Sequence, residues 1–220
     1  MKVSEAVAAR RSCRAFLDKP VDQAVVREVL EKAARTASGG NLQPWRVYLL
    51  TPDTLADFKA QMAERSAKGL MDTPEYPVYP SPLKAPYRSQ RFTVGETMYD
   101  RLGIPREDKP ARLKWFANNY QFFGAPSAAF LFVDREMVIA QWTDLGAYLG
   151  TVMLLLEEAG LASCPQEAWV TQHKFVSGFL DVPAELMLFA GLAIGYADED
   201  HPVNGFRTER AEPAEWLVEK

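Results

Sequence analysis

The segment Trp142–Trp169, WTDLGAYLGTVMLLLEEAGLASCPQEAW, decides how the chain folds, because it joins its longest helical pattern to a shorter extended run. Apolar residues surround the middle of the helical pattern, which extends from Val138 to Ala159 and predicts a long buried helix. Working outward, Pro165–Trp169 is expected as a strand or loop, Gln172–Leu180 as a helix and Leu186–Tyr196 as a buried strand. This alternation predicts an α/β or α+β domain layered on a central sheet.

The N-terminal half shows the same alternation of helical and extended patterns. Apolar periodicity and capping residues predict helices at Val3–Ala9, from an N-cap at Asp22 to Arg35, from Pro52 to Lys68, at Gly95–Leu102 and at Lys109–Phe123. Short apolar runs predict strands at Arg46–Leu50 and Ala128–Val133. Gly69–Pro86 is rich in proline and tyrosine. Because proline removes backbone donors, we expect a long ordered loop or lid there.

Composition argues against several classes of protein. The net charge of −4 does not suit a nucleic-acid binder, which needs a basic surface to neutralise phosphates. The first residues lack the uncharged apolar core of a signal peptide, and no apolar run is long enough to cross a membrane. The two cysteines, Cys13 and Cys164, form no CxxC pair and suit a reducing compartment. We therefore expect a soluble cytoplasmic protein with no nucleic-acid or membrane partner.

The chain carries few of the familiar catalytic motifs. It has two histidines, His173 and His201, and neither lies at metal-ligand spacing from another ligand, so no metal site is expected. His173 is expected on the surface of a helix. No GxSxG, GxGxxG or GxxxxGK[ST] motif occurs. If the protein is an enzyme, a bound organic cofactor is expected to carry the chemistry.

Two polar segments are candidates for binding such a cofactor. Arg10, Arg11, Ser12 and Arg14 would lie close together, with Arg10 and Arg14 one turn apart if the helix continues, and this grouping suits a phosphate monoester. The alternative is a solvated basic turn. Ser38–Trp45, SGGNLQPW, contains two glycines that let backbone amides approach a ligand. The alternative there is an ordinary loop whose tryptophan plugs the core.

Together, RRSCRAF and SGGNLQPW resemble the N-terminal signature of the FMN-dependent nitroreductase family. The resemblance continues through FFGAPSAAFLFVD, the Trp142–Trp169 segment and GLAIGYADEDHPVNGFRTERAEPAEW, and so covers nearly the whole chain. It implies an α+β fold in which helices surround a central mixed sheet. It also implies one domain over residues 1–220, with a lid-like insertion at about 69–107. The arm at about 197–220 would be exchanged in a homodimer that holds two FMN molecules at its interface.

The resemblance also assigns the cofactor contacts. Residues at matching positions are Arg10, Arg11, Ser12 and Arg14 for the phosphate and the flavin polar edge; Ser38, Gly39, Asn41 and Gln43 for a loop contributed by the partner; Asn118 and Gln121 near the ribityl chain and pyrimidine; Pro165, Gln166, Glu167 and Ala168 beside flavin N5; and Arg207 and Arg210 closing on the phosphate. Gln121 departs from the lysine that the family often has. No side chain is assigned as a catalyst, because hydride passes from NADPH or NADH to flavin N5 and then to the substrate.

The insertion PEYPVYP…PYRSQR, together with QEAW, is similar to the subgroup that reduces nitrobenzoates and related nitroaromatics. The resemblance thus implies an NAD(P)H-dependent reductase of small aromatic substrates with ping-pong kinetics. Aromatic and cationic side chains that could face the substrate are Tyr76, Tyr79, Tyr87, Arg88 and Arg91, unless they only pack the insertion down. The other possibilities are a quinone or enone reductase, a reductive dehalogenase or a flavin-fragmenting enzyme of the same family, a flavin-binding protein without turnover, and a structural dimer that has lost its cofactor.

Overall fold

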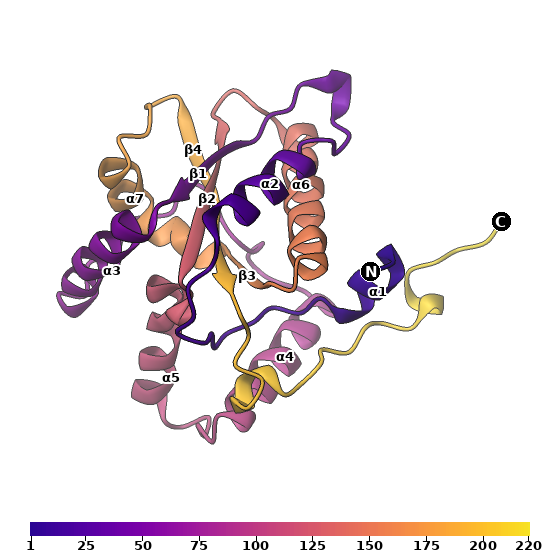
Figure 1. Ribbon diagram of the computed structural model, residues 1–220. Helices are drawn as coiled ribbons and strands as arrows, with labels where there is room; N and C mark the ends of the chain where they lie inside the picture. The colour runs from indigo at the N-terminus through magenta and orange to yellow at the C-terminus, as the bar shows by residue number, and fades with distance from the viewer.

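The computed structural model describes all 220 residues and is built around a four-stranded sheet (Figure 1). The strands are β1 (Arg46–Leu50), β2 (Ser127–Asp134), β3 (Ala162–Gln166) and β4 (Leu186–Gly195), in the order β1-β2-β4-β3. Every neighbouring pair is antiparallel, which corrects the expected mixed sheet. The chain that links β3 to β4 returns to the same end of the sheet, so the two strands run in opposite directions. A parallel pairing occurs only at the isolated bridge between Ser12 and Ser163.

Helices cover both faces of the sheet, which confirms the predicted α+β class. They are α1 (Val3–Ala9), α2 (Gln23–Ala33), α3 (Pro52–Ala67), α4 (Tyr87–Arg101), α5 (Lys109–Phe116), α6 (Ile139–Glu158) and α7 (His173–Phe179). In Figure 1, α2 and α6 lie on one side of the sheet, and α3 and α7 lie on the other. Both termini project from the same side of the body (Figure 1). The predicted N-cap of α2 is confirmed, since the Asp22 side chain accepts a hydrogen bond from the Ala24 amide.

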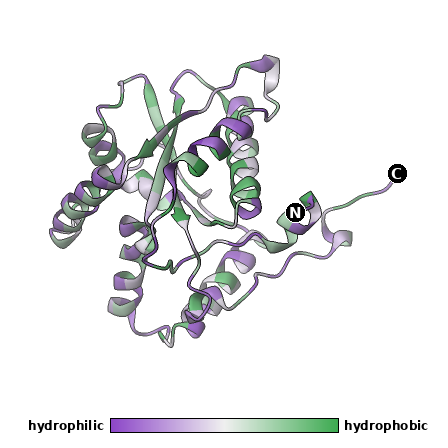
Figure 2. Cartoon of the chain, in the orientation of Figure 1, coloured by the Kyte–Doolittle hydropathy of each residue, from purple (hydrophilic) through white to green (hydrophobic).

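The sheet separates two apolar cores because successive side chains of a strand point to opposite faces. Phe130 and Phe132 of β2 pack with α3 and α7, whereas Leu131 between them packs with α2 and α6. All three side chains are completely buried. Figure 2 shows the hydrophobic colouring concentrated along the central strands, with polar colouring on the outward faces of the helices.

Helix α6 is only partly covered by its own chain, although its sequence predicted a buried helix. Leu145, Val152 and Leu156 face the sheet and are completely buried. An alanine side chain added at Gly146 or Gly150 would meet no atom within 4 Å, so this face is open. By length and composition alone α6 could cross a membrane, but its packing on α2 and the sheet identifies it as a core helix of the folded domain.

The region between α3 and β2 differs most from the sequence-based expectation. Helix α4 begins at Tyr87, eight residues before the predicted start at Gly95, because the proline-rich stretch Gly69–Pro86 ends at Pro86. The predicted helix Lys109–Phe123 ends at Phe116 and continues as a 3-10 segment, η2, over Ala117–Gly124. Phe122 and Phe123 have φ values of 50° and 53°, which no α-helix can contain. Both rings are buried, so core packing holds this conformation.

The insertion is attached firmly at its start. The Asp72 carboxylate pairs with Arg65 at 2.7 Å and accepts from the Lys174 amide at 3.0 Å. His173, expected on the surface, is 7% exposed, because its ring lies between the Thr73 carbonyl and the Glu75 carboxylate, each at 3.1 Å. The first residues of the predicted lid are therefore part of the folded body.

Candidate functional site

The arginine-rich motif lies in an extended segment against β3. Helix α1 ends at Ala9, so Arg10 and Arg14 are not related by a helical turn. Ser12 instead forms a bridge with Ser163, and the Cys13 amide donates to the Ser163 carbonyl at 2.9 Å. Cys13 points into the core and is fully buried, whereas Arg10, Arg11, Ser12 and Arg14 are all half-buried.

The C-terminal arm adds a fourth arginine to this motif. Arg207 donates from its guanidinium to the Ala9 carbonyl at 2.7 Å and to the Arg10 carbonyl at 3.0 Å. Two segments that were predicted to bind the phosphate therefore lie in contact, although Arg207 and Arg10 are 197 positions apart in the sequence. Arg210 does not join them, since its guanidinium donates to the oxygens of Thr208 and Glu209 beside it.

The charges of this cluster are poorly balanced by the chain itself. Arg10, Arg14 and Arg207 take part in none of the six ion pairs, and Arg11 pairs with Glu199. The Arg11 Nε is buried and has no hydrogen-bond partner. Unpaired guanidiniums and an orphaned donor indicate a site that an anion with several oxygens would complete, and a flavin mononucleotide phosphate meets that description.

A further carboxyl lies beside the cluster, at the C-terminal end of α6. Desolvation raises the pKa of Glu157 above its usual range, while the charges of Arg11, Arg207 and Arg10 act in the opposite direction. Sequence reasoning missed this residue. A carboxylate in the last turn of a helix, where the helix dipole disfavours it, is the signal that could have revealed it.

Asn204 also escaped the sequence analysis, yet it ties the motif to the arm. Its side chain accepts from the Arg14 amide at 2.9 Å and donates to the carbonyls of Ala15 and Asp198 at 2.8 and 2.9 Å. It is 4% exposed, and a buried asparagine with three bonds to two segments acts as a clamp. Asn204 therefore positions the backbone of the arginine motif.

The residues after β3 have distinct roles in the structure. The Gln166 amide donates to Asn119 and accepts from the Trp169 indole at 3.2 Å, so this side chain is committed to the core. Desolvation raises the pKa of the Glu167 carboxyl, although much of the residue is exposed. Pro165 and Ala168 are half-buried. The backbone from Pro165 to Ala168, together with the Glu167 carboxyl, is what this strand end offers to a ligand.

The two residues predicted near the ribityl chain lie in η2. Gln121 donates to the Lys59 carbonyl of α3 at 3.0 Å, and the Lys59 amine donates to the Ala125 carbonyl at 2.6 Å. Asn118 is half-buried. Because the Gln121 amide is held by α3, its side chain serves to fix η2 in place.

The glycine-rich loop lies at the other end of α6. The Gly39 amide faces the Asp144 carboxylate at 3.2 Å, and the Gln43 amide donates to Ser38 Oγ at 3.0 Å. Asn41 and Gln43 have positive φ values of 57° and 51°, a conformation that asparagine tolerates well. Gly39, Asn41 and Gln43 are exposed, and Ser38 is half-buried.

This loop and the arginine cluster are well separated within one chain. The loop contacts α6 at Asp144, and the arginines lie near Glu157, thirteen positions further along the helix. At a rise of about 1.5 Å per residue, that is roughly 20 Å. The two predicted halves of the site therefore do not meet in a single subunit.

The predicted substrate residues divide into two groups. Tyr76 donates to the Phe189 carbonyl at 2.7 Å and packs edge-on against Trp142, and burial raises the pKa of its hydroxyl. It therefore anchors the insertion to the body. Tyr79 stacks under Arg91, with 4.4 Å from the guanidinium carbon to the ring centre. Arg88 is exposed on the first turn of α4.

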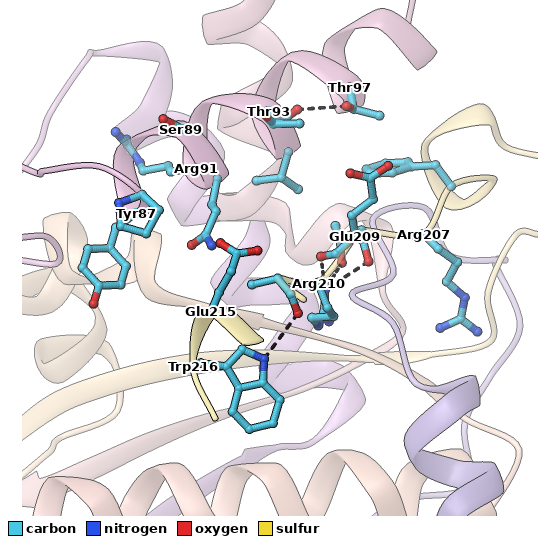
Figure 3. A pocket seen from close by; sticks show the side chains of 16 residues that line it. Tyr87, Ser89, Arg91, Thr93, Thr97, Arg207, Glu209, Arg210, Glu215 and Trp216 are labelled. Atoms are coloured by element: carbon cyan, nitrogen blue, oxygen red, sulfur yellow. Dashed lines mark hydrogen bonds between the residues drawn. The ribbon is translucent and has the colours of Figure 1, made fainter. Parts of the chain in front are cut away.

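A cleft of about 1000 Å³ lies between α4 and the arm. Tyr87 and Arg91 line it from the helix, and Arg207, Arg210 and Trp216 line it from the arm (Figure 3). It touches the arginine cluster only through Arg207. The cleft is thus next to the candidate phosphate site, and all the residues that line it belong to the predicted lid or to the C-terminal arm.

Comparison with known proteins identifies clear relatives. The model of the Nitroreductase family matches residues 7–196. A nitrobenzene nitroreductase of Ectopseudomonas oleovorans is 33% identical, over 98% of this chain and 96% of that protein. The FMN and NADPH-dependent nitroreductase NfnB from sphigopyxis sp. strain HMH is 44% identical with a TM-score of 0.96, covering 100% of this chain and 99% of its own. The FMN-dependent NfnB from Mycobacterium smegmatis, solved in complex with NADPH, is 28% identical with a TM-score of 0.93, over 99% and 98% of the two chains.

Proposed function

The chain belongs to the nitroreductase family, and from that premise we propose that it is an FMN-dependent NAD(P)H oxidoreductase that reduces nitroaromatic compounds. The observation that carries the proposal is the arginine cluster: Arg207 donates to the backbone of the arginine motif, and Arg10, Arg14 and Arg207 take part in no ion pair. When bound there, FMN would supply the hydride chemistry, which no side chain of this protein can perform.

The residues of the chain would bind, orient and shield. Arg10 and Arg14 would grip the phosphate, and Arg207 would close over it from the arm, which Asn204 holds in register. The backbone from Pro165 to Ala168 would lie along the reacting edge of the ring. Because donor and acceptor would use the same place in turn, we expect ping-pong kinetics.

The active unit is proposed to be a homodimer with two sites. The Ser38–Gln43 loop and the arginine cluster lie roughly 20 Å apart along α6, so one site can contain both only if two chains contribute. The two projecting termini also expose apolar side chains that a partner would bury. Exposed apolar residues on the projecting termini are Val3, Val7, Trp216, Leu217 and Val218. A second subunit, with the 197–220 arm exchanged, would bury them.

The lid and the compartment complete the proposal. Residues 69–107 are proposed to form the wall of the substrate pocket, with Tyr79, Tyr87 and Arg91 facing an electron-poor ring or the nicotinamide donor. Cys13 and Cys164 are both free and buried, in keeping with a soluble protein of the cytoplasm.

An anaerobic visible spectrum tests the function directly. The purified protein should show a flavin spectrum that bleaches with NADPH and recovers when 4-nitrobenzoate is added. Flavin that bleaches but is not reoxidised by nitroaromatics would overturn the substrate proposal and turn attention to quinones, enones or halides. A protein that cannot be loaded with FMN would overturn the cofactor proposal.

A further inference from the structure

The Glu199 carboxylate occupies an unexpected place beside the arginine cluster. It forms the ion pair with Arg11, the one motif arginine that has a carboxylate partner. Its charge also acts on Glu157 at the end of α6, together with the charges of Arg10, Arg11 and Arg207. A site suited to an anion therefore has a carboxylate of its own chain at its edge.

The backbone holds Glu199 in this place. The preceding residue, Asp198, donates from its amide to the Ala15 carbonyl at 3.0 Å, and Ala197 forms an antiparallel bridge with Phe16. On the other side of Glu199, the Asn204 side chain accepts from the Arg14 amide at 2.9 Å. The segment that carries Glu199 is thus fastened on both sides to the segment that carries the arginines, so the ion pair is a built feature of the fold.

The pair leaves Arg11 incompletely satisfied. One terminal nitrogen contacts Glu199, while the buried Nε has no partner. The Glu199 side chain is 68% exposed, compared with 26% for Arg11, so the carboxylate can be neutralised without opening the core. Removing a fixed negative charge near a bound phosphate dianion strengthens the attraction that the dianion feels.

We propose that Glu199 weakens the hold of the site on the cofactor phosphate, by neutralising Arg11 and repelling the dianion. This inference rests on the proposed FMN site and adds a residue that sets how tightly the phosphate is held. The Glu199 carboxylate would thereby make the cofactor easier to exchange. Removal of its charge should tighten the binding of a flavin that carries a phosphate and leave the binding of a phosphate-free flavin unchanged.

The test compares FMN and riboflavin binding to the full-length protein after its flavin has been removed. Flavin fluorescence gives the Kd for wild type, Glu199→Gln and the control Glu64→Gln, which makes the same charge change at an exposed position on α3, on the other side of the sheet from α6. In about 0.01 M salt, where the Debye length is about 30 Å, Glu199→Gln should bind FMN about three- to tenfold more tightly. The riboflavin Kd of Glu199→Gln should stay that of wild type, as should both values for Glu64→Gln. The FMN gain should shrink at about 1 M salt, where charges are screened within about 3 Å.

Three results would overturn the inference. Unchanged or weaker FMN binding by Glu199→Gln would mean that the carboxylate does not oppose the phosphate. An equal gain for riboflavin would assign the effect to the fold and not to the charge. A gain that is independent of salt would do the same. Each can be told apart from failure of the proposed function, in which wild type itself would bind no FMN.

Discussion

Replacing Asn204 by alanine tests how the arginine motif is held in place. The substitution removes three hydrogen bonds of 2.8 to 2.9 Å from a side chain that is 4% exposed. Each such bond contributes about 1 kcal/mol, and the groups left behind at Arg14, Ala15 and Asp198 lose their partner. We expect the free energy of unfolding to fall by about 2–3 kcal/mol, a large part of the roughly 5–15 kcal/mol of a typical domain.

Urea unfolding followed by tryptophan fluorescence measures the loss, with all samples at one protein concentration because a dimer is stabilised by mass action. Gln90→Ala is the matched control, since this exposed amide on α4 makes no side-chain hydrogen bond. FMN should also dissociate faster from Asn204→Ala, because the Arg14 backbone loses its tether. A change below about 0.5 kcal/mol would refute the clamp. A destabilised protein that keeps FMN as firmly as wild type would refute its connection to the site.

Three further predictions concern the site and its support. Arg10→Ala combined with Arg14→Ala should release FMN from a protein that still folds, because neither guanidinium has an ion-pair partner to lose; a variant that purifies fully yellow would contradict the phosphate site. Gly191→Ala should lower stability by about 2 kcal/mol or more in thermal unfolding, since the new methyl carbon would lie 2.4 Å from the buried Trp169 ring. An unchanged Tm would show that the ring moves freely. Burial raises the pKa of Cys13 to about 11, so at pH 8 only about 0.1% is thiolate and alkylation of the native protein should be slow. Because the Cys13 pKa is raised in the folded state, the neutral thiol contributes to the free energy of unfolding at neutral pH, and this contribution is lost as the pH rises towards 11. Rapid alkylation of the native protein at pH 8 would contradict the burial of Cys13.

The local sequence pattern was sufficient to predict most of the individual helices and strands. The boundaries of β1 and α1 agree with the expected Arg46–Leu50 and Val3–Ala9, because apolar spacing and turn residues act over a few positions. The cap at Asp22 is equally local. Where the chain conformation depends on distant packing, pattern failed. Phe122 and Phe123 fit a helical pattern, but the buried core holds them in a left-handed turn.

The same division applies to the candidate site. The residue types in RRSCR suit a phosphate, since guanidinium chemistry is local to the side chain, but a solvated basic turn was the alternative, and the resemblance alone assigned Arg207 to the same phosphate. The resemblance gave Arg210 the same role as Arg207, yet its guanidinium turns back to its own segment. Tyr76 similarly proved to be an anchor, because its hydroxyl reaches the Phe189 carbonyl across the sheet.

By itself, then, the sequence determined most of the helices and strands, though not the region from α4 to η2, as well as which side chains could bind a phosphate and which family the chain resembles. Only the tertiary structure decided the antiparallel strand order and the burial of His173. It also decided that Asn204 and Glu199 stand beside the arginines, and that the Ser38–Gln43 loop lies at the far end of α6. The reason is physical: periodicity and capping report interactions over a few residues, whereas these features depend on contacts between segments up to almost 200 positions apart.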